Sequence, residues 1–400
     1  MVGREQSIDQ TTRPPTNVFQ EDQITKQKKI ELNMSLLNGF LGGSLIGGAA
    51  GLTLLGAGEI MGFSGIIGTV LQNPFKAAQD PSQQWKLTFL STFLLSAYAF
   101  FLPVADGDKI SSVASITSPL CYALSGLLVG LGTKLGNGCT SGHGICGMAR
   151  LSKRSISAIL TFMGAAVATT VVTKKPAFDF LRTGAAETYV PSWIMASVAA
   201  TCVGFTLYGA WKSSRNEEKK ESSSDATEST SLINGTSSET CENNESTMNK
   251  RLPAAVGGIT AAAGLSLSTM VYPAAVRGFL DVTTIPDGTW DPTLMFVMMG
   301  GLLVSFVTYQ FVPGHSVVPS CPKLDKPLAD KKFGIPTNQA IDAPLLGGAV
   351  LFGTGWGLTG LCPGPALLLT MTGLSGMVLQ WWPAFFIGQR AGQFIKDHFL

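Results

Sequence analysis

Long apolar segments separated by short polar connections dominate the chain. Three of the longest are "LTFLSTFLLSAYAFFLPVA" (87–105), "ISAILTFMGAAVATTVV" (156–172) and "LMFVMMGGLLVSFVTYQFV" (294–312). A segment of about 20 apolar residues crosses a bilayer as a helix, and the chain contains roughly nine segments of this kind. The pattern predicts an all-α, multi-pass integral membrane protein embedded in a lipid bilayer.

Charged residues make up only 14% of the chain, against about 25% in a typical soluble protein. They concentrate in three polar stretches that are too poor in apolar residues to build a core. The pattern therefore predicts four parts: a disordered N-terminal tail (1–35), a membrane repeat (36–211), a disordered Ser/Glu-rich linker (212–251) and a second membrane repeat (252–396).

The two predicted repeats resemble each other in the order of their motifs. The first opens with "LGGSLIGGAAGL" and later gives "GLGTKLGNGCTSG"; the second opens with "VGGITAAAGL" and later gives "GTGWGLTGLCPGPAL". This order places Cys139 opposite Cys362. Duplicated halves, often in inverted orientation, are typical of transporters and channels, and their small residues let helices pack closely in lipid.

Each of these two cysteines precedes a short helical segment. Pro363 favours the first position of a helix, which puts Cys362 at the N-terminus of a segment that ends before Gly373. That segment has only about ten residues, too few to span the bilayer, and therefore predicts a half-helix. Thr140 and Ser141 give Cys139 the same kind of context.

Two half-helix N-termini that meet near the midplane of the membrane would form an anion site. The backbone N–H groups and the helix dipole attract negative charge there, and irregular backbone is tolerated only where it lines a cavity or is buried. Cysteine adds soft sulfur chemistry, so a small sulfur-containing anion would use both properties. The predicted site residues are Cys139, Thr140, Ser141, Gly142, His143, Cys146, Cys362, Pro363 and Gly364.

The stretches "GNGCTSGHGICG" and "GLCPGPAL" resemble the two cysteine signatures of the YeeE/YedE-type sulfur transport family. The resemblance covers both predicted repeats. It implies an hourglass-shaped helical protein in which cysteine-bearing short helices meet at a constriction. It also implies that thiosulfate passes between thiols through S–H to sulfur contacts, a role that falls here on Cys139, Cys146 and Cys362.

One position departs from the family pattern. Where the family is expected to carry an arginine, in a pattern like G-R-I-x-G-x-S-G, this chain has "GEIMGFSG" with Glu59. An acid at this place would repel an anion unless it faces away. Arg277, in the matching segment of the second repeat, is a possible source of positive charge near the pathway.

Two other functions compete with anion transport. Cys139, His143, Cys146 and Cys362 could bind copper or zinc in a membrane metal carrier, although only one histidine and no carboxylate lies in the motif. A membrane thiol-redox protein is the third candidate, but the spacing is not C-x-x-C. We expect a transporter rather than an enzyme, with no cofactor, no bound metal and no nucleic-acid partner.

Several conspicuous residues have simpler structural interpretations. Cys121 and Cys202 lie in plain apolar segments and are expected to pack in the core. The basic cluster of Arg150, Lys153 and Arg154 is typical of a solvated helix end or a topology signal. The pair Trp381–Trp382 is typical of an interfacial aromatic belt.

Overall fold

The computed structural model describes most of both predicted repeats. The described residues are 16–102, 118–181, 196–197, 199–209, 211–212, 215, 238–315, 317, 321–330 and 332–399, with the backbone alone for 16–29 and 238–249. Within these ranges the chain is mainly helical and contains no β-strand. The predicted all-α fold is thus confirmed.

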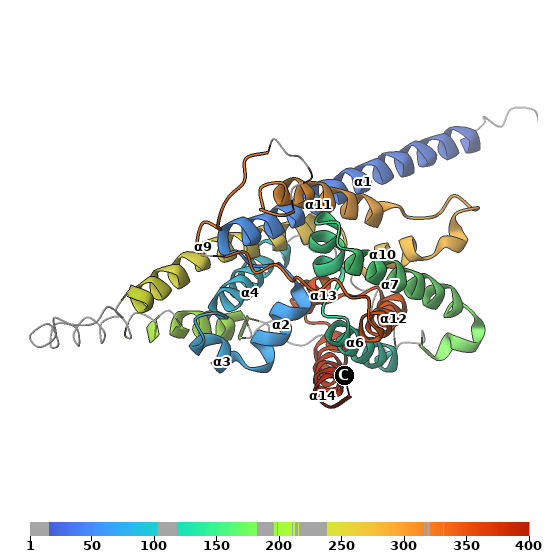
Figure 1. The fold of residues 1–400 in the computed structure, drawn as a ribbon. Helices are drawn as coiled ribbons and strands as arrows, with labels where there is room; N and C mark the ends of the chain where they lie inside the picture. Colours follow the sequence, from blue (N-terminus) through green and yellow to red (C-terminus); the bar gives the residue numbers. More distant parts are fainter. Residues whose placement is uncertain are drawn as a thin grey trace, which may run out of the picture.

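The described residues up to 181 form a long helix followed by several shorter helices (Figure 1). Their bounds are α1 (Thr16–Ala57), α2 (Phe63–Gln72), α3 (Pro74–Gln79), α4 (Gln84–Ser96) with its π-helical extension η1 (Ala97–Phe101), α6 (Pro119–Leu135), η3 (Thr140–Gly147), α7 (Lys153–Val172) and η4 (Pro176–Leu181).

The described residues from 238 form a second series of long and short helices. Their bounds are α9 (Ser238–Leu267), α10 (Pro273–Leu280), η5 (Val282–Thr284), α11 (Thr293–Tyr309), α12 (Ala343–Thr359), α13 (Pro363–Thr370), η6 (Gly376–Trp381) and α14 (Trp382–Phe399).

Glycines bring the first helices of the two halves into direct backbone contact. A Cβ on Gly42 of α1 would lie 2.6 Å from the carbonyl oxygen of Gly264 of α9, and a Cβ on Gly264 would lie 2.7 Å from that of Gly42. Helix α1 also packs against α11, and α9 packs against α4. Each first helix therefore contacts both the first and a later helix of the opposite half.

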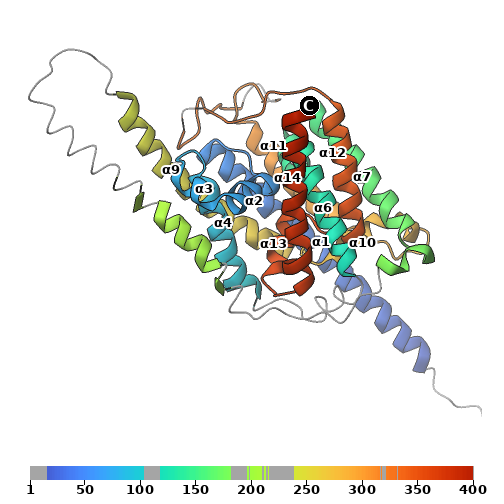
Figure 2. The ribbon, with the colours of Figure 1, turned by 90° about the horizontal axis from the view of Figure 1, so that it is seen from below.

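A second group of helices packs by the same means. A Cβ on Gly132 of α6 would lie 2.6 Å from the carbonyl oxygen of Gly348 of α12, and one on Gly348 would lie 2.9 Å from that of Gly132. Helix α6 also packs against α14, and α12 packs against α7. The four helices run side by side in Figure 2. In lipid the hydrophobic effect does not drive helices together, so their association depends on close van der Waals packing. Small residues at these crossings allow the backbones to approach closely enough for that packing.

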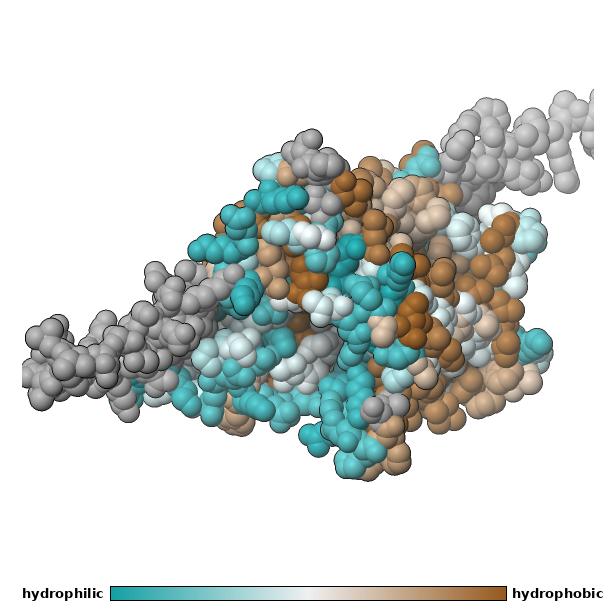
Figure 3. All heavy atoms as spheres, in the orientation of Figure 1, coloured by the Kyte–Doolittle hydropathy of each residue, from teal (hydrophilic) through white to brown (hydrophobic). Residues whose placement is uncertain are grey.

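The described helices include three that are long and apolar enough to cross a membrane: Ile30–Ala57, Lys153–Val172 and Ala343–Thr370. Four shorter apolar helices accompany them. Large hydrophobic side chains such as Leu160 and Leu303 are exposed, and Figure 3 shows hydrophobic residues gathered around α7 and hydrophilic ones around α3 and the end of α14. The chain is a multi-pass integral membrane protein.

The helices extend into both segments predicted as disordered. Helix α1 begins at Thr16, inside the predicted tail, and α9 begins at Ser238, inside the predicted linker. The Glu, Gln and Lys residues at the start of α1 are good helix formers, so the helix continues past its apolar part. The remaining parts of these predictions, residues 1–15, 213–214 and 216–237, lie outside the described residues.

The expected aromatic belt at Trp381–Trp382 is wrong. Trp381 is fully buried and Trp382 is 7% exposed. Their indole N–H groups donate to the hydroxyls of Ser125, at 3.3 Å, and Thr370, at 2.7 Å. A tryptophan can be buried when its N–H finds such a partner, and here both partners come from neighbouring helices.

Candidate functional site

Cys139 and Cys362 occupy equivalent positions, each as the N-cap of a short helix. Both have extended backbone dihedrals, and each precedes an eight-residue helix, η3 or α13. Two residues before each cysteine the chain turns through a left-handed residue, Asn137 (φ 58°) and Gly360 (φ 77°). Asparagine and glycine tolerate this conformation best. A long helix can thus end and a short helix begin within a few residues.

The two short helices meet in the interior of the protein. The hydroxyl of Thr140, at the start of η3, donates to Sγ of Cys362 at 3.6 Å. Cys139 Sγ lies 3.2 Å from Oγ of Ser141, and the thiol of Cys146 donates to the carbonyl oxygen of Met61 at 3.7 Å. All three cysteines are buried, with exposed fractions of 2 to 4%. Each of the three predicted thiols is therefore buried and has a polar contact of its own.

Phe63, the first residue of α2, lies between the two cysteine-bearing helices. Its backbone N–H donates to Oγ of Ser141 at 3.3 Å. Its ring packs so closely on α13 that a Cβ on Gly364 would lie 3.0 Å from a ring carbon. Pro363 and Gly364 are themselves buried. Neither was predicted to contact Phe63, because the sequence alone does not show that α2 reaches both helices.

His143 braces the loop that carries Cys139. Its Nδ1 lies 3.1 Å from Oγ of Ser155 and its Nε2 lies 3.1 Å from the carbonyl oxygen of Gly136. Gly138 is required beside it, since a Cβ there would lie 2.6 Å from the imidazole ring. Both ring nitrogens are occupied by these contacts, which fix the position of the loop.

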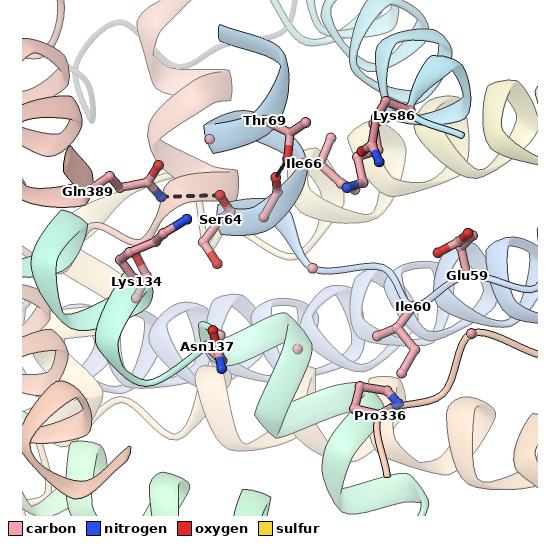
Figure 4. A pocket seen from close by; sticks show the side chains of 18 of the residues that line it. Glu59, Ile60, Ser64, Ile66, Thr69, Lys86, Lys134, Asn137, Pro336 and Gln389 are labelled. Carbon is pink, nitrogen blue, oxygen red and sulfur yellow. Dashed lines mark hydrogen bonds between the residues drawn. The ribbon is translucent and has the colours of Figure 1, made fainter. Parts of the chain in front are cut away.

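A cavity of about 990 Å³ opens beside η3 and the start of α2 (Figure 4). Its wall includes Gly138, Gly142 and His143, the close neighbours of Cys139 along the chain. Basic side chains outnumber acidic ones in the wall. The basic residues are Lys76, Lys86, Lys134, Arg150 and Arg154, and the acidic residues are Glu59 and Asp80.

Arg150 and Arg154 hold the connection between α11 and α12 against this cavity. Arg150 Nη1 donates to the carbonyl oxygen of Pro336 at 3.0 Å, and Arg154 pairs with Asp342 at 3.0 Å. Pro336 is itself part of the cavity wall. The basic cluster was interpreted from the sequence as a solvated helix end, but these two members line the cavity, and Lys153 alone is exposed.

Glu59 does not stand alone as an acid facing the cavity. It forms an ion pair with Lys250 at 3.6 Å, and Lys250 also pairs with Asp330. Burial raises the pKa of Glu59, against the opposing effect of Lys250 and Lys86. The lysine lies in α9, just before the predicted second repeat, so Glu59 is accompanied by a cation from the C-terminal part of the chain.

Arg277 does not line the cavity. It is half-buried in α10, and its side chain packs near the turn before Cys362, where a Cβ on Gly360 would lie 3.2 Å from its Cγ. Its charge is therefore closer to the Cys362 loop than to the basic cavity. Cys121 and Cys202 are buried, as expected of core residues.

Ser64 and Lys134 also face the cavity (Figure 4), and neither was predicted as a site residue from the sequence. Ser64 lies within the quoted stretch "GEIMGFSG", which was the available signal. Among the described residues, no group of three or more His, Cys, Asp or Glu side chains is arranged to hold a metal ion.

Comparison with known proteins identifies relatives of part of the chain. Residues 250–396 match a family described as "Family of unknown function (DUF6691)". A "Probable transporter" of Xylella fastidiosa (strain Temecula1 / ATCC 700964) is 38% identical over 147 residues, which are 37% of this chain and 88% of that protein. Another "Probable transporter" of the same strain is 40% identical over 129 residues, which are 32% of this chain and 88% of that protein.

Proposed function

Because this chain belongs to the family of the Xylella fastidiosa probable transporters described above, we propose that it is a membrane transporter for a small sulfur-containing anion. The substrate is thiosulfate or a close analogue. It passes between the thiols of Cys139, Cys146 and Cys362 without covalent bond formation.

The contact between Thr140 and Cys362 carries this proposal. It joins the N-termini of two short helices from opposite halves of the chain, inside the protein, next to a cavity with a basic wall. Helix N-termini favour anions, and thiols are weak donors that suit a soft sulfur acceptor. A sulfur-containing oxyanion satisfies both preferences at once.

The transport pathway in this proposal lies between two pseudo-symmetric repeats, 36–211 and 252–396. The packing of α1 with α9 and of α6 with α12 supports this division, since each pair joins corresponding helices of the two halves. The left-handed residues Asn137 and Gly360 before the two cysteines support it as well. Transporters built from such repeats place their substrate site where discontinuous helices meet.

His143 argues against a soft-metal carrier. A metal-binding imidazole needs one free nitrogen, and both nitrogens of His143 already contact Ser155 and Gly136. The remaining groups are three thiols without a carboxylate in the motif. The sulfur anion is therefore the better match to the residues present.

Uptake of ³⁵S-labelled thiosulfate into proteoliposomes tests the proposal. We expect time-dependent uptake that unlabelled thiosulfate blocks and that a membrane-permeant thiol reagent abolishes. Sulfate, selenite and copper(I) serve as competitors. Tight copper(I) binding without thiosulfate uptake would reject the proposal and support a metal carrier instead.

A further inference from the structure

Ser64 presents an unpartnered hydroxyl to the cavity. The residue is only 4% exposed, yet its Oγ forms no hydrogen bond with any described residue and points toward the space between Lys134 and Asn137 (Figure 4). Ser64 lines the cavity wall, so this hydroxyl faces the cavity and is free to donate a hydrogen bond to a ligand there.

The backbone at this position offers a second donor. Ser64 is in the first turn of α2, a ten-residue helix. The N–H of Phe63 donates to Ser141, and that of Gly65 donates to the carbonyl oxygen of Gly62. The N–H of Ser64 has no such partner among the described residues, so the positive end of the helix dipole faces the cavity there.

Lys134 supplies the charge. It lies in the last turn of α6, and its ammonium group points toward Ser64 (Figure 4). Its stem is held against α14, where a Cβ on Gly392 would lie 2.9 Å from Lys134 Cβ. Arg154, by contrast, is paired with Asp342. Among the described residues, Lys134 forms no ion pair, so its charge is available to a ligand.

The glycines around this point leave room for that ligand. A Cβ added to Gly62, Gly65 or Gly142 would meet nothing within 4 Å. Gly142 follows Ser141, which contacts Cys139. An anion at Ser64 would therefore lie near the loop that carries Cys139 without displacing any described side chain.

We propose that Ser64, Lys134 and the first turn of α2 form a binding site for a small tetrahedral oxyanion, occupied before the anion reaches the cysteines. The site recognises oxygen atoms, through N–H, O–H and ammonium donors, whereas the thiols recognise sulfur. This proposal depends on the proposed function in one respect: the ligand of the site is the transported anion. Sulfate and thiosulfate share the oxygen atoms that it binds, so both occupy it.

Binding of ³⁵S-sulfate and ³⁵S-thiosulfate to the full-length protein in nanodiscs tests this site. Lys134→Gln and Ser64→Ala each weaken the binding of both anions about tenfold, the loss of one charge-assisted or buried hydrogen bond, and Lys134→Arg restores it. Lys153→Gln, a change at an exposed lysine outside the cavity, is the matched control and leaves binding unchanged.

The result separates this site from the cysteine relay. Cys139→Ala retains sulfate binding at the site, even if it abolishes thiosulfate uptake. Wild-type binding of both anions by Lys134→Gln and Ser64→Ala would overturn the site and leave the relay intact. Absence of sulfate binding to the wild-type protein would overturn it as well. Normal uptake by Cys139→Ala, with binding lost in Lys134→Gln, would reject the relay and retain the site.

Discussion

Thr140 and Cys362 are 222 residues apart in the chain, yet the threonine hydroxyl donates to the cysteine sulfur at 3.6 Å. The contact is possible because Thr140 is the first residue of one short helix and Cys362 is the N-cap of another, and each follows a left-handed residue. A residue of the Cys139 loop thereby touches the opposite cysteine directly. In the proposed pathway, this hydroxyl orients Sγ of Cys362 toward the substrate.

Replacing Thr140 by valine tests that role. Valine keeps the shape of threonine but removes the hydroxyl, so Cys362 loses its donor. We expect uptake to fall about tenfold, a loss equivalent to one hydrogen bond, while the yield of folded protein stays the same. Thr140→Ser retains the hydroxyl and should keep most of the uptake. Equal uptake by the two variants would show that the hydroxyl has no role.

Gly43 should be irreplaceable in the packing of α1 against α11. A Cβ there would lie 2.0 Å from the carbonyl oxygen of Val297. Because that oxygen belongs to the backbone of α11, the clash can be relieved only if the two helices move apart. We expect Gly43→Ala to lower the free energy of unfolding by about 1–3 kcal/mol, as for other overpacked sites, measured by thermal unfolding in detergent.

Gly48 provides the matched control on the same helix. An added Cβ there meets nothing within 4 Å, and alanine is the better helix former. Gly48→Ala should leave the unfolding temperature unchanged or raise it slightly. Equal destabilisation by the two substitutions would contradict the close crossing of α1 and α11.

The ion pair between Arg154 and Asp342 should make stability depend on pH. Burial raises the pKa of Asp342, but hydrogen bonds from Arg154 and from the N–H of Leu345 outweigh this effect and hold the pKa below its ordinary value. The pair therefore stabilises the folded state above the ordinary aspartate pKa of about 4. This stabilisation is lost as the pH falls through the lower folded value.

Asp342→Asn isolates this effect, because asparagine still caps α12 while it removes the charge. The Asp342 side chain is 39% exposed, so we expect a loss of only about 1 kcal/mol at pH 7. Unfolding temperatures of the variant and the wild type should converge as the pH falls below about 4. A difference that stays constant from pH 7 to pH 3 would contradict the assignment.

The local pattern around the cysteines was enough to predict where the short helices begin. Proline at position 363 and the glycines before Cys362 allow few other conformations. The apolar segments likewise predicted a multi-pass membrane protein. Of the quoted segments, 156–172 lies in α7, which is long enough to cross a membrane, whereas 294–312 gives the shorter helix α11. These features depend on residues that are neighbours in the chain.

Features that depend on distant segments could not be predicted in the same way. Arg150 and Arg154 line the cavity because the connection before α12 folds back onto them. Trp381 is buried because Ser125 on another helix accepts its N–H. Ser64 faces the cavity because α2 turns back toward η3. In each case the partner lies more than 70 positions away in the chain.

The central claim is tested most directly by thiosulfate uptake into proteoliposomes containing the wild type, Cys139→Ala, Cys362→Ala or Cys121→Ala. The last is a buried cysteine of α6 outside the proposed pathway and serves as the control. We expect both pathway variants to fold normally and to lose uptake, while Cys121→Ala transports like the wild type. Uptake at the wild-type rate by folded Cys139→Ala or Cys362→Ala would contradict the cysteine relay.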